Sequence, residues 1–299
     1  EITPLGTGAA LPARGRHPSA QLLNASEELY LIDCGEGTQE RLRRIGVNFM
    51  RIGHVFISHL HGDHYLGLVG LISTMHLMGR TRVLHVHAPE GIGSIIDIQL
   101  QASRTYLRFP LKVHVLPEGS GQEVWSDRFV RVTSLALVHR IPCVGFIFKE
   151  APLPRNLRKE KVHLIPHFMR QAVKEGADLA LPDGSSLPNE ELTTDPMVPR
   201  SFAYCSDTAY APELIEHLLG VDLLYHEATF TEQMSGRAKE TMHSTARQAG
   251  MIARDANVGR LLLGHFSSRY KDVDALVAEA RTVFPHAQAA EEGITLPIV

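Results

Sequence analysis

The chain has 299 residues, of which 44% are hydrophobic and 21% are charged, and its formal net charge is −3. This composition is typical of a soluble globular protein with one large domain or two ordinary ones. No apolar run reaches the roughly 18 residues of a membrane span, and the negative charge argues against a nucleic-acid partner unless basic residues are concentrated locally.

Short apolar strands alternate with helical patterns. Strands are predicted at 19–24, 29–33, 54–58, 83–88, 112–115, 123–125, 129–138, 144–149, 202–206, 221–226, 260–264 and 293–298. Helices are predicted at 36–45, 65–78, 211–218, 244–256 and 272–283. Strands and helices mixed in this way favour an α/β fold with stacked sheets and helices outside.

The stretch from 150 to about 200 interrupts this rhythm, because its pattern is irregular and rich in proline. It begins with a local excess of positive charge, carried by Lys149, Arg155, Arg158, Lys159 and Lys161. A long irregular stretch inside a compact domain is usually a functional loop. We interpret 150–200 as an inserted, protruding arm with a phosphate-binding role; a solvated loop with an ordinary charge cluster is the alternative.

The most informative motif is Ser-His-Leu-His-Gly-Asp-His at 58–64, directly after the predicted strand at 54–58. Imidazole and carboxylate groups suit zinc and similar divalent ions. His59 and His61 are two positions apart, so on an extended backbone they point the same way. Asp63 and His64 follow a glycine that lets the chain turn. The motif therefore predicts ligands for two metal ions.

Three further ligand candidates stand at the ends of other predicted strands: His139, Asp207 and His265. A single histidine at a strand end is commonly structural, but ligands in layered α/β folds collect where strand ends open into loops. A carboxylate has two oxygens, so Asp207 can bridge two ions.

This motif with the three later ligands resembles the metallo-β-lactamase superfamily. Within it, other segments resemble ribonuclease Z: Gly6-Thr7-Gly8, Leu31–Gln39, Ser206-Asp207-Thr208, His226-Glu227-Ala228-Thr229, His243-Ser244-Thr245 and His265–Tyr270. They span nearly the whole chain in the expected order. The resemblance implies a four-layer αββα sandwich across 1–299 and an endonuclease that removes the 3′ trailer from precursor tRNA.

The resemblance also assigns roles to residues. It implies two zinc ions, with manganese or iron as other occupants, one held by His59, His61 and His139 and the other by Asp63, His64 and His265. Asp207 would bridge them, and Asp33 would orient a ligand histidine. Asp63 would help deprotonate the attacking water.

The same family pattern implies that His243, paired with Glu227, protonates the leaving oxygen. For His243 the alternative is a position at a helix N-terminus, because Ser244-Thr245 resembles a cap. Arg269 follows His265 by four residues and is expected to grip a phosphate; a structural salt bridge explains it equally well.

By position, the arm corresponds to the family's exosite for the tRNA elbow, although 164–170 departs from the usual Gly-Pro-Leu-containing run. The family commonly works as a homodimer. Two rival functions remain: a hydrolase of small phosphodiesters, sulfate esters or thioesters, and a non-catalytic RNA-binding protein with a structural metal. The cysteines, Cys34, Cys143 and Cys205, are odd in number and scattered, and no basic-then-apolar leader begins the chain; we expect a cytoplasmic protein.

Overall fold

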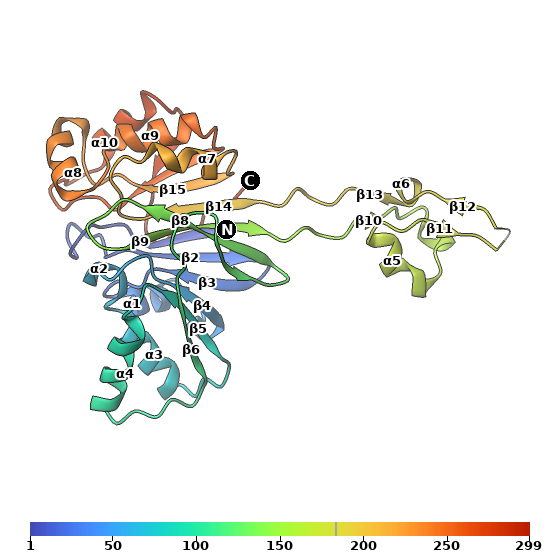
Figure 1. Ribbon diagram of the computed structural model, residues 1–299, viewed down its shortest axis with the longest axis horizontal. Coiled ribbons are helices and arrows are strands. Elements are labelled where there is room, and N and C mark those ends of the chain that lie inside the picture. Colours follow the sequence, from blue (N-terminus) through green and yellow to red (C-terminus); the bar gives the residue numbers. More distant parts are fainter. Residues whose placement is uncertain (183) are drawn as a thin grey trace. The chain divides into compact units, whose positions relative to one another are not determined.

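The computed structural model describes residues 1–182 and 184–299, so one position of the predicted arm, 183, lies outside the described residues. The chain divides into two compact units. Residues 1–149 and 200–299 form the larger unit, called the body below, and residues 150–199 form the smaller unit, called the insert (Figure 1).

The body contains two large β-sheets. The first has the order β1-β2-β3-β4-β5-β6, with antiparallel pairs up to β3 and parallel pairs from β3 onwards. Its strands are β1 (Ile2–Gly6), β2 (Ala20–Ala25), β3 (Glu28–Ile32), β4 (Ile52–Phe56), β5 (Leu84–Ala88) and β6 (Leu111–Val115).

The second sheet has the order β17-β16-β15-β14-β9-β8-β7. Its strands are β7 (Glu123–Ser126), β8 (Val130–Leu137), β9 (Cys143–Glu150), β14 (Ser201–Cys205), β15 (Leu223–Glu227), β16 (Arg260–Gly264) and β17 (Ala287–Ala289). The run from β14 to β17 is parallel, so these strands present their carboxyl ends along one edge.

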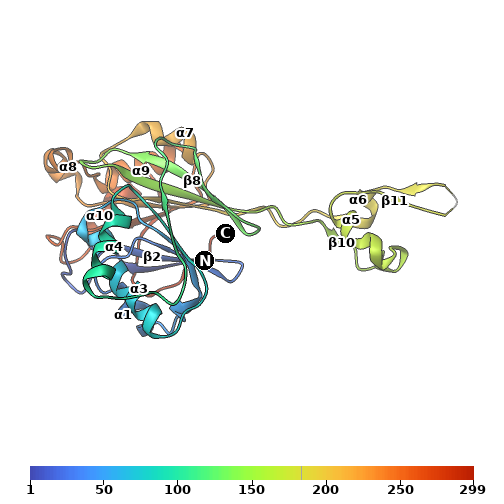
Figure 2. The same ribbon diagram turned by 60° about the horizontal axis from the view of Figure 1, so that its bottom comes forward.

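Helices cover the outer faces of both sheets, giving four layers (Figures 1 and 2). On the first sheet lie α1 (Thr38–Arg44), α3 (Leu68–Leu77) and α4 (Ile92–Ala102). On the second lie α7 (Ile215–Leu218), α9 (Ala246–Asp255) and α10 (Asp274–Arg281). Two short helices, α2 (Gly62–Tyr65) and α8 (Ser235–Thr241), lie in connections, and 3₁₀ turns occur at Phe49–Arg51, Pro212–Leu214 and Glu232–Met234.

Alternation along each strand explains why the layers stack. In β4, Val55 packs under the helices while Phe56 faces the other sheet. In β15, Leu224 packs under α9 while Tyr225 faces the first sheet. Successive strand side chains point to opposite faces, so a strand that is apolar throughout is buried on both sides.

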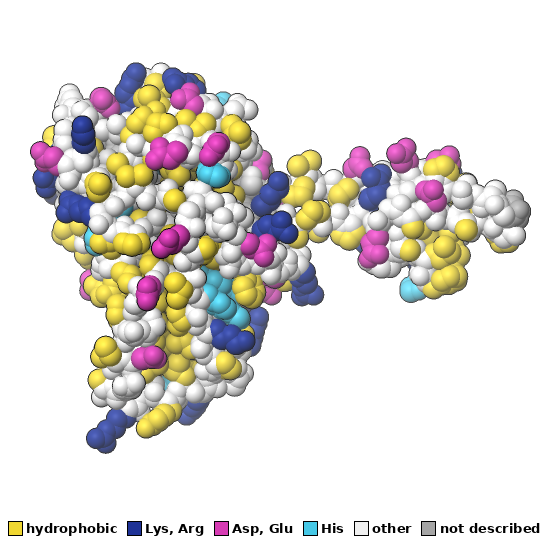
Figure 3. Space-filling model, viewed as in Figure 1, with side chains coloured by type: hydrophobic (Ala, Val, Ile, Leu, Met, Phe, Trp, Pro, Cys, Tyr) yellow, Lys and Arg dark blue, Asp and Glu magenta, His cyan; other side chains and the backbone are white. Residues whose placement is uncertain are grey.

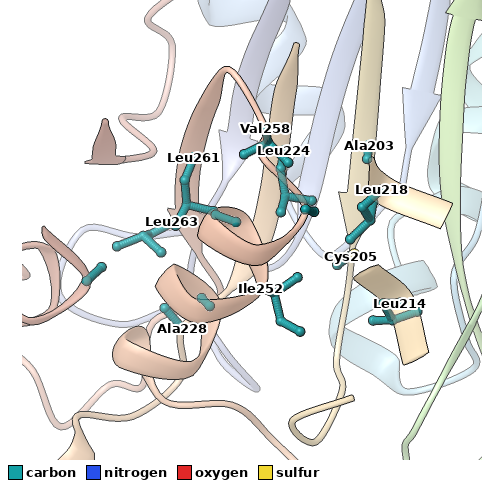
Figure 4. Packing of buried hydrophobic residues seen from close by; sticks show 14 of the residues in the cluster. Ala203, Cys205, Leu214, Leu218, Leu224, Ala228, Ile252, Val258, Leu261 and Leu263 are labelled. Atoms are coloured by element: carbon teal, nitrogen blue, oxygen red, sulfur yellow. The ribbon is translucent and has the colours of Figure 1, made fainter. Parts of the chain in front are cut away.

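The helices on the outer face of the second sheet pack closely against it. Ile252 of α9 lies among Leu224, Leu261 and Leu263 of the parallel strands (Figure 4). The side chain of Thr245 caps α9 and accepts from the Gln248 amide, while the Gln248 side chain accepts from the Thr245 amide. This reciprocal cap fixes where the helix begins, and with it the position of the residues just before it.

The insert has its own secondary structure. Its elements are β10 (Asn156–Leu157), 3₁₀ turns at Val162–Leu164 and His167–Met169, α5 (Arg170–Lys174), β11 (Leu179–Ala180), β12 (Ser186–Leu187), α6 (Asn189–Leu192) and β13 (Thr193–Thr194). A small core of Ile165, Val173, Leu179 and Leu192 holds it together. The insert is therefore more ordered than its irregular, proline-rich sequence suggests.

The sequence predictions differ from the structure in two ways. The last strand, predicted at 293–298, lies instead at Ala287–Ala289, and Leu296 contributes only an isolated bridge to Ile2. Strand β1 and helix α4 have no counterpart among the predicted elements. Within the described residues, no helix has both the length and the apolar character that crossing a bilayer requires.

Candidate metal and catalytic site

Strand ends from both sheets meet at one cleft. His59 follows β4, Asp207 follows β14 and His265 follows β16, each within three residues of the strand end. His139 follows β8, and His61 lies at the start of α2. The carboxyl ends of the strands thus deliver their side chains to a common point, as expected for sites on layered α/β folds.

A first group of possible ligands consists of His59, His61, His139 and Asp207, whose nitrogen and oxygen atoms all lie within 4.8 Å of one another. Nδ1 of His61 lies 3.0 Å from Nε2 of His59 and 3.3 Å from Nε2 of His139. The His61 ring stands at 81° to that of His59 and at 85° to that of His139. Because the His61 ring is nearly perpendicular to the other two, nitrogens of all three rings can point at one common position.

A second group consists of Asp63, His64 and His265. Oδ2 of Asp63 lies 3.5 Å from Nε2 of His64 and 3.6 Å from Nε2 of His265. The same oxygen accepts a 2.8 Å hydrogen bond from the amide of Ala10, a residue with a positive φ of 66°.

Asp207 stands between the two groups and gives one oxygen to each. Its Oδ2 lies 3.6 Å from Nε2 of His59 and 3.7 Å from Nε2 of His139. Its Oδ1 lies 3.4 Å from Nε2 of His64 and 3.1 Å from Nε2 of His265. A carboxylate in this position is suited to bridge two cations.

Buried polar atoms without hydrogen-bond partners indicate whether metal ions fit this site. Nε2 of His64, Nε2 of His265 and Oδ1 of Asp207 are buried, and within the described residues none has a hydrogen-bond partner. A buried polar atom without a partner costs about 1–3 kcal/mol. Three such atoms facing one another fit a divalent cation, which accepts nitrogen and oxygen ligands.

Neighbouring groups hold the ligand histidines from behind. Nδ1 of His64 donates to Oδ2 of Asp33 at 2.7 Å, and this buried carboxylate also accepts from Tyr204 at 2.7 Å and from the Ser58 hydroxyl at 3.0 Å. Nδ1 of His139 donates to the Met242 carbonyl at 2.9 Å. Such partners fix the tautomer and leave Nε2 for a metal.

Burial and charge set the protonation of the ligands. Burial lowers the pKa of His59 strongly, and neighbouring imidazoles lower it further, so this ligand is neutral. For His64, burial is outweighed by the negative charges of Asp207 and Asp33, which raise its pKa well above the usual value. The centre of the site therefore attracts positive charge.

A carboxylate–imidazole pair borders the metal ligands. Nδ1 of His243 donates to Oε1 of Glu227 at 2.8 Å, and Glu227 is fully buried. Burial opposes both charges, but their attraction prevails: it lowers the pKa of Glu227 to about 2 and raises the pKa of His243 to about 9. Thr245, not His243, is the N-cap of α9.

Part of this arrangement lines an open cleft of about 670 Å³. Its lining includes metal-ligand candidates, His243, Phe230 and three arginines. Because Nδ1 of His243 is held by Glu227, its Nε2 is the nitrogen available to a molecule in the cleft.

Known proteins resemble this chain over all or part of its length. One family model, described as a β-lactamase superfamily domain, matches residues 171–266, and another, described as anti-Pycsar protein Apyc1, matches residues 1–105. Ribonuclease Z of Porphyromonas gingivalis is 46% identical over 98% of this chain and 97% of its own length. Ribonuclease Z of Phocaeicola vulgatus is 43% identical over 100% of this chain and 97% of its own.

The chain belongs to the ribonuclease Z family. It is a metal-dependent phosphodiesterase of the endoribonuclease type. The crystal structure of human tRNase Z, short form, superimposes with a TM-score of 0.73 at 28% identity, covering 100% of this chain and 99% of that one. The metallo-β-lactamase fold protein YhfI of Bacillus subtilis, with a TM-score of 0.67 at 21% identity over 98% and 96% of the two chains, shares the fold. The predicted metallo-β-lactamase fold is thus confirmed, and this fold implies divalent metal ions at the site.

The structure brings the seven predicted metal ligands of this chain together. Asp33 contacts one of these ligands, and the pair of Glu227 and His243 lies beside them. Arg269 lines the cleft; its guanidinium lies over the Phe230 ring at 5.6 Å and donates to the Ser267 hydroxyl at 3.3 Å. No ion pair of Arg269 occurs among the described residues, so the salt-bridge alternative finds no partner there.

The predicted basic residues of the arm are divided between the two units. Lys149 is exposed on β9 of the body. In the insert, Arg155 pairs with Asp195. Arg158 and Lys159 line a shallow pocket together with Lys174, while Lys161 is only half-exposed.

Sequence reasoning missed several supporting residues. The hydroxyl of Thr229 lies between Glu227 and His265, and Thr229 is the last residue of the His226–Thr229 motif, which was a usable signal. The hydrogen bond from Tyr204 to Asp33 could not be predicted, because a tyrosine inside an apolar strand is normally interpreted as a core residue.

Proposed function

We propose that this protein is a zinc-dependent endoribonuclease that removes the 3′ trailer from precursor tRNA and leaves a 3′-hydroxyl on the tRNA. The observation that carries the proposal is the position of Asp207, with one oxygen toward His59 and His139 and the other toward His64 and His265. Family relatives named ribonuclease Z and tRNase Z support the choice of substrate.

The proposal places two zinc ions on the seven ligands. When bound, such a pair supplies Lewis acidity that neutralises a phosphate oxygen and lowers the pKa of an attacking water. Asp63 is the residue that we assign to orient and deprotonate that water. The Ala10 amide holds Oδ2 of Asp63 in place, and the two neighbouring histidines lower the pKa of Asp63 despite its burial, so this carboxylate is ionised and ready to accept a hydrogen bond.

The breaking bond joins phosphorus to the 3′ oxygen of the tRNA, and that oxygen needs a proton as it leaves. His243 is protonated at neutral pH because its pKa is raised to about 9 by Glu227. It lines the cleft and has its Nε2 free of Glu227. We assign His243 as the general acid, and Glu227 as the group that orients and charges it.

The insert is the proposed exosite for tRNA. Arg158, Lys159 and Lys174 border one pocket on it together with a single acidic residue, Glu160, and backbone phosphates are natural partners of such an excess of positive charge. A homodimer, in which one subunit's insert serves the other's substrate, is part of the proposal. So is a cytoplasmic location, with which the three buried, free cysteines agree.

The test is incubation of purified, zinc-loaded protein with a precursor tRNA, mapping the cut at nucleotide resolution. We expect a single cut at the start of the trailer, with a 3′-hydroxyl on the tRNA and a 5′-phosphate on the trailer. Hydrolysis of a small phosphodiester without any cut in precursor tRNA would refute the proposal.

A further inference from the structure

Three arginines line the cleft, each on a different segment of the body. Arg140 follows His139 in the β8–β9 connection, Arg237 lies on α8, and Arg269 lies in the loop after β16. All three are exposed. They come from three different segments, so a strand lying in the cleft would meet positive charge from more than one part of the chain.

The guanidiniums of Arg140 and Arg237 are available to a ligand. Within the described part of the chain, the side chain of Arg140 makes no ion pair or hydrogen bond. Arg237 pairs with Glu240 at 3.0 Å, but both side chains are about half-exposed or more, at 48% and 68%. An exposed pair of this kind is worth less than about 1 kcal/mol, so a phosphate can replace the carboxylate.

The acidic groups of the cleft do not cancel this charge. Asp63 and Asp207 face the histidines and belong to the metal ligands. Of the cleft's other lining residues, only Glu36 is acidic. The rim therefore carries a local excess of positive charge in a chain whose net charge is −3.

We propose that Arg140 and Arg237 bind the phosphates that flank the phosphate being cut, and that together with Arg269 they select a strand with several consecutive phosphates over a small diester. The inference rests on the proposed function, since it concerns the same cleft. A guanidinium suits this role because its planar fork binds phosphate oxygens in pairs and never loses its charge.

The experiment uses the single variants Arg140→Gln and Arg237→Gln in the full-length, zinc-loaded protein. Steady-state kinetics are measured on precursor tRNA and on bis(p-nitrophenyl) phosphate. The salt dependence of precursor binding is measured by fluorescence anisotropy on the zinc-loaded protein, with each arginine variant combined with His243→Ala so that the precursor is bound but cut only slowly. Arg131→Gln is the matched control, because Arg131 is an exposed arginine on β8 that pairs with Glu123 and does not line the cleft.

We expect each cleft variant to lower kcat/KM for precursor tRNA about 10-fold, as loss of one charged hydrogen-bonded contact does. The slope of log K against log salt should shrink by about 0.7 to 0.9 for each arginine. Hydrolysis of the small diester, and every property of Arg131→Gln, should equal the wild type.

Wild-type kinetics and an unchanged salt slope in both cleft variants would overturn the inference. So would an equal loss on precursor and small diester, because the arginines would then act on the reacting phosphate itself. In a third outcome, the wild type binds the precursor without cutting it, with a salt slope that shrinks in the arginine variants. In that case the proposed function is wrong, but the inference that these arginines bind phosphates is supported.

Discussion

The hydroxyl of Thr229 lies 2.9 Å from Nδ1 of His265 and 2.6 Å from Oε2 of Glu227. His265 donates to the hydroxyl, which in turn donates to the carboxylate. Glu227 therefore orients His243 directly and His265 through Thr229, so one buried carboxylate positions both the proposed acid and a proposed metal ligand.

Replacing Thr229 with valine tests this connection. Thr229→Val keeps the shape but leaves Nδ1 of His265 without its acceptor, so we expect zinc affinity to fall about 10- to 100-fold, as for other supports of metal ligands. Competition with a chromogenic chelator measures it. Thr229→Ser keeps the hydroxyl and should restore most of the affinity; equal losses in both variants would contradict the role given to the hydroxyl.

Asp63→Ala should nearly abolish cleavage of precursor tRNA while the fold stays intact. The change removes a proposed ligand and the group that holds the attacking water, and both losses act on the chemical step. Single-turnover kinetics measure the rate, and circular dichroism checks the fold. A variant that still cuts at the wild-type rate would refute the role of Asp63.

His243→Ala should lower kcat about 10²- to 10⁴-fold, the usual contribution of a general acid, with zinc content unchanged. The pH profile gives a second readout. An acid acts in its protonated form, so activity should fall as pH rises through about 9, the pKa of His243. Glu227→Gln removes the charge that raises this pKa and should move the alkaline limb to lower pH. Loss of zinc from His243→Ala would make the residue a ligand or a structural support instead.

The metal-ligand candidates were accessible from sequence because each follows a short apolar strand, and strand ends in a layered fold meet at one edge. The distances between the ligands, and the residues that hydrogen-bond to them, could not be predicted from sequence. The contact between Tyr204 and Asp33 joins residues 171 positions apart, and no local pattern encodes it. The secondary structure inside the insert was also not predictable from sequence, because its two-residue strands and short helices are held by a core of few side chains, and a periodic pattern needs longer elements.

Deleting residues 150–200 separates tRNA recognition from chemistry. Lys149 of β9 and Ser201 of β14 are paired across antiparallel strands, so a two-residue Asn-Gly turn can join them without moving the body. We expect the shortened protein to lose cleavage of precursor tRNA and to keep hydrolysis of bis(p-nitrophenyl) phosphate. Full activity on the precursor would show that the insert does not bind tRNA.

A second histidine cluster, on the strands of the first sheet, predicts acid sensitivity of the fold. His54, His85, His87 and His114 lie on one face of β4, β5 and β6, and histidine side chains reach the surface of the body in Figure 3. Nδ1 of His54 is 3.2 Å from Nε2 of His87, and Nδ1 of His85 is 2.9 Å from Nε2 of His114. The two pairs stack, with 4.7 Å between the rings of His54 and His85.

Each of these hydrogen bonds needs one nitrogen to accept, so a pair with both rings charged cannot form it. Burial, with neighbouring imidazoles, lowers the pKa of His54 to about 4 and that of His87 to about 2. Above pH 6.5 both histidines are neutral in the folded and unfolded states. Below it the unfolded chain takes up protons that the folded chain does not, so stability decreases as pH falls, from about 6.5 to about 4 for His54 and on to about 2 for His87.

The quantity to measure is the decrease in unfolding free energy between pH 7 and pH 4.5. In the double variant His54→Gln/His87→Gln this decrease should be smaller by about 2 kcal/mol per histidine. Trp125 is the chain's single tryptophan, and its ring lies 4.4 Å from that of His54, so its fluorescence reports the unfolding of this face directly. His286→Gln, an exposed histidine outside the cluster, is the control. An acid destabilisation equal to that of the wild type in the double variant would show that its source lies among other groups, such as the histidines of the metal site.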